Sequence, residues 1–112
     1  MPILDADYSR ISHEDMASAI GLKTKHIPLL IANFIEESAS IMEALKNAIE
    51  ARDYEKIRAS AHSIKGSAGN LKFNEIYEMA RDVEFAGAKE ESDFAYEPYF
   101  EAIRDAIGTI SL

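Results

Sequence analysis

The residue with the clearest potential for chemistry is His62, in the stretch AHSIKGSAGN. A neutral imidazole is a good nucleophile, and an unperturbed pKa of about 6.5 leaves much of an exposed histidine neutral near pH 7. Two glycines follow it, Gly66 and Gly69, although each glycine inside a helix costs about 1 kcal/mol relative to alanine. Close approach of another molecule to the imidazole would explain small residues at these positions.

Helical spacing predicts which residues share the face of His62. The apolar stripe of this helix recurs at steps of four and three, and His62 lies about 140° from the centre of that stripe. Lys65, Gly66 and Gly69 follow at steps that return to the same outward face. Arg58, four residues before His62, lies at its edge. We therefore expect an exposed histidine flanked by two cations, on a strip with little side-chain bulk.

The other candidate nucleophiles are best explained as ordinary surface residues. We expect His13 and His26 to be ordinary surface histidines. Ser63 and Ser67 have no base at a spacing that would activate a hydroxyl. The chain has no cysteine, which excludes a disulfide scaffold, a thiolate metal site and a cysteine nucleophile. It also lacks the G-x-x-x-x-G-K-[ST] phosphate loop, so we expect neither ATP binding nor kinase activity from this chain alone.

The elements that position His62 are predicted to be helices. The sequence has only five glycines and three prolines, and no window alternates apolar and polar residues in a sustained way. The expected helices cover about residues 13–20, 26–51, 53–70, 74–89 and 95–110. In the histidine helix we expect the inward residues to be Ile57, Ala61, Ile64, Ala68 and Leu71. This pattern predicts an all-α fold, an antiparallel four-helix bundle with a short additional N-terminal helix.

Local signals mark several of the helix ends. Ser12 is a predicted N-cap of the first helix, and Gly21 is expected to end it. Pro28 suits the first turn of the long helix, where its missing N–H costs least. Asp53 is predicted to open the histidine helix, and Asn74 to cap the helix after it.

Length and charge limit the possible functions. A chain of 112 residues suits a single domain, residues 1–112. The net charge of −8 argues against nucleic-acid binding, because phosphate backbones require a basic face. The longest apolar run, residues 27–35, is too short to span a bilayer, and the N-terminus has no signal-peptide pattern. We therefore expect a cytoplasmic protein without membrane contact.

The motif AHSIKGSAGNL resembles the signature of histidine-containing phosphotransfer (HPt) domains, in which two variable residues and then Lys-Gly follow the histidine. The resemblance extends over about residues 24–90, through the long helix, the histidine helix and the helix after it. The chain departs from the pattern at the end of the histidine helix, where many members of the family have glycine and this chain has Lys72 followed by Phe73. This departure affects the expected turn but not the histidine.

The resemblance implies a carrier in a multistep phosphorelay. The phosphoryl group would pass from the aspartyl phosphate of a receiver domain to Nε2 of His62, and then to the aspartate of a second receiver. Lys65 and Arg58 would stabilise the charged oxygens. The receiver, in a response regulator or a hybrid sensor kinase, would supply Mg²⁺, and this chain would bind no metal or cofactor. We expect a monomer.

Docking to a receiver also requires apolar surface. The candidates are Met16 and Ile20 on the first helix and Phe73 beyond the histidine helix. Gly66 and Gly69 are expected to clear space for the active-site loops of the receiver.

Two other functions remain possible from the sequence. In one, the same fold is the HPt domain of a chemotaxis-type kinase, and a separate ATP-binding domain phosphorylates His62. The other is a metal-carrying or pure interaction bundle. The sequence contains no Glu-x-x-His motif of the kind that di-iron bundles place inward, which argues against the metal carrier.

Overall fold

The computed structural model describes residues 1–111, and within them the chain is helical with no strand. The first helix, α1, is short and spans His13–Ile20, and a 3-10 turn, η1, spans Thr24–His26. Four longer helices follow, and these are α2 (Ile27–Ala51), α3 (Tyr54–Asn70), α4 (Asn74–Ala88) and α5 (Tyr96–Gly108).

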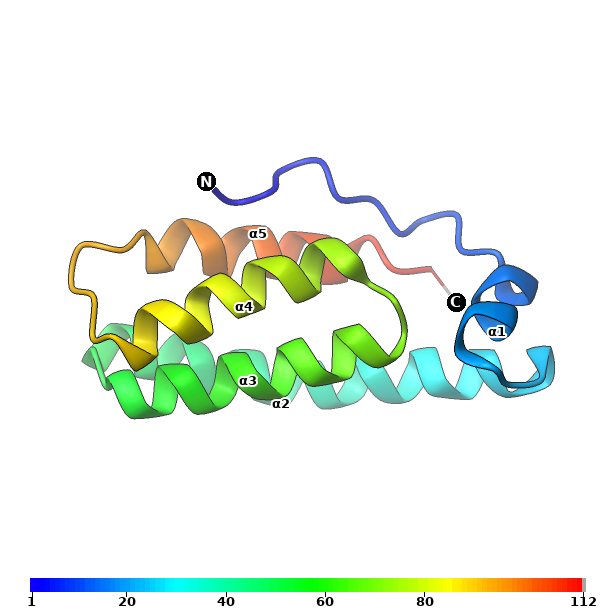
Figure 1. The fold of residues 1–112 in the computed structure, drawn as a ribbon, viewed down its shortest axis with the longest axis horizontal. Coiled ribbons are helices and arrows are strands. Elements are labelled where there is room, and N and C mark those ends of the chain that lie inside the picture. Colours follow the sequence, from blue (N-terminus) through cyan, green and yellow to red (C-terminus); the bar gives the residue numbers. More distant parts are fainter. Residues whose placement is uncertain (112) are drawn as a thin grey trace.

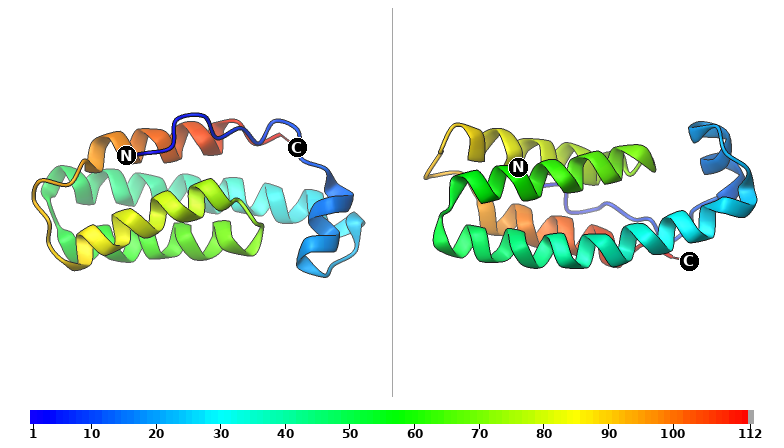
Figure 2. Two further views of the ribbon diagram at one scale, coloured as in Figure 1. Left: turned by 45° about the horizontal axis from the view of Figure 1, so that its top comes forward. Right: turned by 90° about the horizontal axis from the view of Figure 1, so that it is seen from below.

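The four longer helices form an antiparallel bundle of two layers. In Figure 1, α3 and α4 lie in front of α2 and α5. Helix α3 packs against both α2 and α4, and α5 packs against α2 and α4. Helix α1 lies beyond the end of the bundle at which the turn between α3 and α4 is found (Figures 1 and 2). The predicted all-α bundle with a short additional N-terminal helix is therefore confirmed.

The predicted helix boundaries agree with the structure to within one or two residues. The side chain of Ser12 accepts a hydrogen bond from the N–H of Asp15, and Gly21 ends α1 with φ 74°. Asp53 caps α3 by accepting from the N–H of Lys56. These predictions succeeded because each cap is a contact between residues three or four positions apart.

The predicted cap at Asn74 is wrong. Asn74 is the first residue of α4, and Phe73 occupies the cap position without a side-chain hydrogen bond. The hydroxyl of Tyr8 instead accepts from the N–H groups of Glu75 and Ile76, at 3.2 and 3.4 Å, and donates to the Glu75 carboxylate. Burial raises the pKa of Tyr8, and the Glu75 carboxylate raises it further. A tyrosine distant in sequence therefore caps α4.

Tyr8 belongs to an extended N-terminal segment, residues 1–12, which lies along the bundle (Figures 1 and 2). The N–H of Ile3 contacts the sulfur of Met79 on α4, at 3.3 Å. The N–H of Tyr8 donates to the hydroxyl of Thr109, just after α5, at 2.9 Å. The segment thus covers the side of the bundle formed by α4 and α5.

The core confirms the predicted rotation of α3. Every residue of the inward stripe is buried, namely Ile57, Ala61, Ile64, Ala68 and Leu71. Helix α4 contributes Ile76, Met79, Ala80 and Val83 to the same core, and α5 contributes Tyr96, Tyr99, Ala102 and Ile103. Because burying a Leu- or Ile-sized side chain contributes about 1.5–3 kcal/mol, this stripe fixes which face of α3 remains outside.

Helices α3 and α4 lie in close contact at Gly87. A Cβ on Gly87 would lie 3.1 Å from the backbone nitrogen of Arg58 and 3.2 Å from the carbonyl oxygen of Tyr54. Backbone atoms cannot move aside as a flexible side chain can. Gly87 therefore sets the spacing of the two helices at this end of the pair.

The turn between α3 and α4 contains Lys72 at φ 62°, in the left-handed region. Only glycine enters this region without a steric cost, which is about 1–2 kcal/mol for other residues. The chain therefore keeps the backbone conformation for which glycine is best suited, although it has lysine at this position.

The glycine contacts predict opposite effects for two alanine substitutions. Gly87→Ala should lower the free energy of unfolding by about 1–3 kcal/mol, because its methyl group must push the backbones of α3 and α4 apart. Gly66→Ala, the matched control, should raise it by up to about 1 kcal/mol, because no atom lies within 4 Å of the added methyl. Urea unfolding measures both. Equal effects of the two substitutions would show that helix spacing does not depend on Gly87.

Candidate functional site

His62 lies on the outward face of α3, as the periodicity predicts. Its side chain is 62% exposed, while its neighbours Ala61 and Ile64 are fully buried. The buried stripe thus anchors the helix and presents the imidazole to solvent. An exposed imidazole on a rigid helix is accessible to a partner and is held at a defined position.

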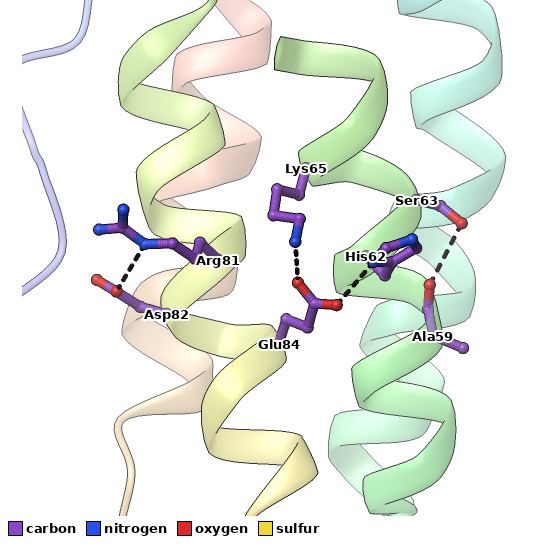
Figure 3. Close-up of polar contacts among 7 residues, drawn as sticks. All are labelled: Ala59, His62, Ser63, Lys65, Arg81, Asp82 and Glu84. Carbon is purple, nitrogen blue, oxygen red and sulfur yellow. Dashed lines mark hydrogen bonds and ion pairs between the residues drawn. The ribbon is translucent and has the colours of Figure 1, made fainter.

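A carboxylate on α4, Glu84, bridges two candidate site residues of α3, His62 and Lys65 (Figure 3). Its Oε2 lies 2.7 Å from Nδ1 of His62, and its Oε1 lies 2.6 Å from Nζ of Lys65. Only 12% of the Glu84 side chain and 21% of the Lys65 side chain is exposed. His62, Lys65 and Glu84 are hereafter called the histidine triad.

The contact with Glu84 determines which nitrogen of His62 can react. A carboxylate oxygen accepts hydrogen bonds, so Nδ1 is the donor and carries the proton. In the neutral ring, Nε2 then holds the free lone pair. Nε2 lies on the side of the ring opposite Nδ1, away from Glu84. The geometry therefore leaves Nε2 as the nucleophilic atom.

The charge of Glu84 is stabilised by its neighbours. Burial on its own raises the pKa of this carboxyl group, but the ammonium of Lys65 and the ring of His62 lower it, and the net pKa lies below its ordinary value. The carboxylate therefore remains ionised at neutral pH. A buried carboxylate without such partners would be strongly disfavoured.

The structure refines the expected positions of the two cations. Lys65 is not a freely solvated side chain, because its ammonium is paired with Glu84 at the edge of the site. Arg58 is exposed on α3, one turn before His62. Both lie on the helix that carries the histidine, and Lys65 contacts the same carboxylate as the imidazole does.

The two glycines of the motif differ in their surroundings. Apart from the adjacent residues and the backbone of α3 itself, no atom lies within 4 Å of a Cβ placed on Gly66, so the surface there is open. A Cβ on Gly69 would lie 3.1 Å from Cδ2 of Tyr77 on α4. The expectation that Gly69 simply clears space for a partner therefore needs correction, because the ring of Tyr77 occupies part of that space.

One predicted docking residue is wrong. Phe73 is only 1% exposed, and its ring packs against those of Tyr8 and Phe34. It therefore offers no surface to a partner, because the N-terminal segment and α2 cover it. Met16 and Ile20 are half-buried on α1, where they pack against the core, and their role in docking stays a prediction.

Sequence reasoning missed Glu84. Helical periodicity places it beside the inward residue Val83 of α4, an unusual position for an acidic side chain. Glu84 and His62 are also nearly equally far from the turn at residues 71–73, so an antiparallel helix pair brings them to the same level. These two signals together could have identified Glu84 as a partner of His62.

Neither a metal-binding cluster nor a membrane-spanning helix is found among the described residues. Within residues 1–111, no group of three or more His, Asp or Glu side chains is arranged to hold a metal ion. In the same part of the chain, none of the helices has the length and apolar character needed to cross a membrane.

Residues 29–111 match the Hpt domain family. Because this match covers most of the chain and includes α3 and α4, the chain belongs to the Hpt domain family, whose members are phosphotransfer carriers of two-component systems. Hpt domains interact with receiver domains in phosphorelays. Comparison with curated proteins and with solved structures found no significant match.

The lowered pKa of Glu84 predicts a pH-dependent contribution to stability. An ionised, paired carboxylate stabilises the fold above the pKa of the unfolded chain, about 4.3, and this contribution is lost as pH falls through the lower pKa of the folded state. Glu84→Gln should therefore lower the free energy of unfolding at pH 7 and have a smaller effect at pH 3.

Urea unfolding at the two pH values tests this prediction. Glu78→Gln is the matched control, because Glu78 is exposed on the same helix, and its effect should stay within about 0.5 kcal/mol. If Glu84→Gln has the same effect at pH 3 as at pH 7, the ion pair does not contribute as its geometry indicates.

Proposed function

We propose that this chain is a phosphorelay carrier in which His62 accepts a phosphoryl group from the aspartyl phosphate of a receiver domain and passes it to an aspartate of another receiver. The observation that supports this most directly is the contact between Nδ1 of His62 and Glu84, 2.7 Å long. It holds the exposed ring in the tautomer whose Nε2 can attack phosphorus.

In the forward step, the lone pair of Nε2 forms a bond to phosphorus. The bond between phosphorus and the aspartyl oxygen breaks, and its electron pair leaves with the aspartate carboxylate. The ring gains positive charge as the N–P bond forms, and the Glu84 carboxylate at Nδ1 stabilises that charge. Return of the phosphoryl group to a second aspartate is the same step in reverse. No proton has to leave the ring during either transfer.

The cations on α3 fit the charge of the transferred group. Phosphoryl transfer depends mostly on in-line positioning and on stabilising the phosphoryl oxygens. Lys65 lies beside the ring because its ammonium and Nδ1 bind the same carboxylate. Arg58 is on the same helix, one turn before His62. We expect Lys65 to be the main stabilising cation, and the receiver to supply Mg²⁺.

The first test identifies the phosphorylated atom. A receiver charged with acetyl phosphate should transfer its label to His62 alone, and the product should be the Nε2 isomer because Nδ1 is held by Glu84. Peptide mapping by mass spectrometry locates the residue, and ³¹P–¹H NMR distinguishes the two ring nitrogens.

The controls use the other histidines of the chain. His62→Gln should abolish labelling, whereas His13→Gln and His26→Gln should leave it unchanged. Labelling by a phosphorylated receiver also distinguishes the proposed function from the chemotaxis-type alternative. In that alternative, the label would come only from ATP through a separate kinase domain. Label on His13 or His26 would contradict the proposed site.

The second test concerns the clearance above Gly66. Gly66→Gln should leave the protein folded, because open space surrounds this position, and should still slow transfer from a receiver by at least about tenfold. The side chain rises one turn from His62 on the same face and obstructs the partner. Thermal unfolding and receiver-dependent transfer should be measured on the same sample.

Gly108→Gln is the matched control for the effect of adding a large side chain at an exposed glycine. Gly108 is also exposed and open to solvent, but it lies at the end of α5. That variant should transfer at the normal rate. Normal transfer by a stably folded Gly66→Gln protein would rule out the clearance role.

A further inference from the structure

The exposed face of α3 continues beyond His62 to an aromatic side chain of α4. Gly69 follows His62 by seven residues, nearly two helical turns, so it lies on the same face about 10 Å further along the helix. A Cβ on Gly69 would lie 3.1 and 3.5 Å from Cδ2 and Cε2 of Tyr77. The ring of Tyr77 therefore lies close to the backbone of α3, and the absence of a side chain at Gly69 allows it to do so.

Between His62 and Tyr77 the surface is open. Gly66 lies between them, and no side chain or other helix approaches within 4 Å of a Cβ placed on it. Tyr77 itself is only half-buried. The imidazole and the tyrosine ring thus bound an open strip along α3, which we call the His62–Tyr77 strip and define as His62, Gly66, Gly69 and Tyr77.

A receiver that delivers a phosphoryl group to Nε2 must cover this strip. A stable protein interface buries about 800 Å² on each partner, which corresponds to a disc with a radius of roughly 16 Å. Tyr77 lies within that radius when the disc is centred on His62. Contact at Tyr77 is thus continuous with the contact that the transfer itself requires.

We propose that Tyr77 is a docking residue that helps to select the receiver. This inference rests on the proposed function and extends it. The partner is the receiver surface beside the phosphorylated aspartate. An apolar side chain of the receiver, about 10 Å from that aspartate, packs on the ring of Tyr77. Tyrosine suits this role because its large ring is rigid and its hydroxyl can also donate a hydrogen bond.

Packing of α4 on α3 alone would not require this arrangement. The neighbouring positions Ile76 and Ala80 are fully buried and already join α4 to the core. Tyr77 also packs against the core, but it is only partly buried and lies beside the open surface at Gly66. An aromatic side chain that is only partly covered on the face of His62 leaves ring surface for a partner, in addition to its contact with the core.

Comparing the rates with two phosphoryl donors distinguishes an effect on docking from an effect on the transfer step itself. Phosphoramidate is a small donor that transfers its phosphoryl group to an imidazole with release of ammonia, so it needs no docking surface. The second donor is a receiver domain charged with acetyl phosphate, chosen from a panel as the one that transfers fastest to the unmodified protein. Initial rates are measured as a function of the concentration of each donor.

Tyr77→Ala should raise the KM for the phosphorylated receiver by about tenfold, with little change in the rate at saturation. Its rate with phosphoramidate should be unchanged, which also shows that His62 and its fold are intact. Gly69→Ala should raise the same KM, because its methyl displaces the ring without removing it. Phe100→Ala is the aromatic control, since Phe100 lines a groove between α2 and α5 in the other layer, and it should leave this KM unchanged.

The outcomes distinguish this inference from the function on which it rests. If no receiver of the panel transfers to the unmodified protein, the proposed function fails and this inference fails with it. If the unmodified protein accepts the group and Tyr77→Ala shows the same KM, only the docking role is overturned. A parallel loss of the phosphoramidate rate in Tyr77→Ala would also overturn it, because the residue would then act on the structure of the site.

Discussion

The site depends on one buried carboxylate between two helices. Glu84 is nearly enclosed, and its charge is tolerable there only because Lys65 and His62 both bind it. The same contacts hold the imidazole in one tautomer and draw the lysine toward α4. If α4 were displaced along α3 by one turn, about 5.4 Å, neither contact could form. The alignment of the two helices and the chemistry of the histidine are therefore set by the same interaction.

Three glycines along the α3–α4 pair have three different surroundings, and each has a consequence for the site. Gly87 lies against the backbone of α3 and allows the helices to approach closely. Gly69 lies against the ring of Tyr77, and Gly66 faces open space. Close packing at Gly87 brings Glu84 within reach of His62, while the lack of bulk at Gly66 keeps the surface beside the imidazole accessible. The glycines of this helix pair thus serve both packing and access.

The N-terminal segment holds the helix that carries Glu84. The hydroxyl of Tyr8 satisfies two N–H groups at the start of α4, and its ring packs on Phe73 in the turn that precedes the helix. Free N–H groups at a helix start need such partners when they are shielded from water. The extended segment is therefore part of the support of the site, although it contributes no residue to the histidine triad.

The sequence by itself determined the helices, three of the caps, the buried stripe of α3 and the outward position of His62, because each depends on residues three to seven positions apart in or beside one helix. The tertiary structure alone decided that Glu84 binds His62 and that Tyr8 caps α4, since these partners are 22 and 67 residues apart. It also placed Phe73 in the core and the Tyr77 ring against Gly69. Periodicity gives the direction of a side chain from its own helix axis. What that side chain meets depends on the spacing and alignment of neighbouring segments, which only packing fixes.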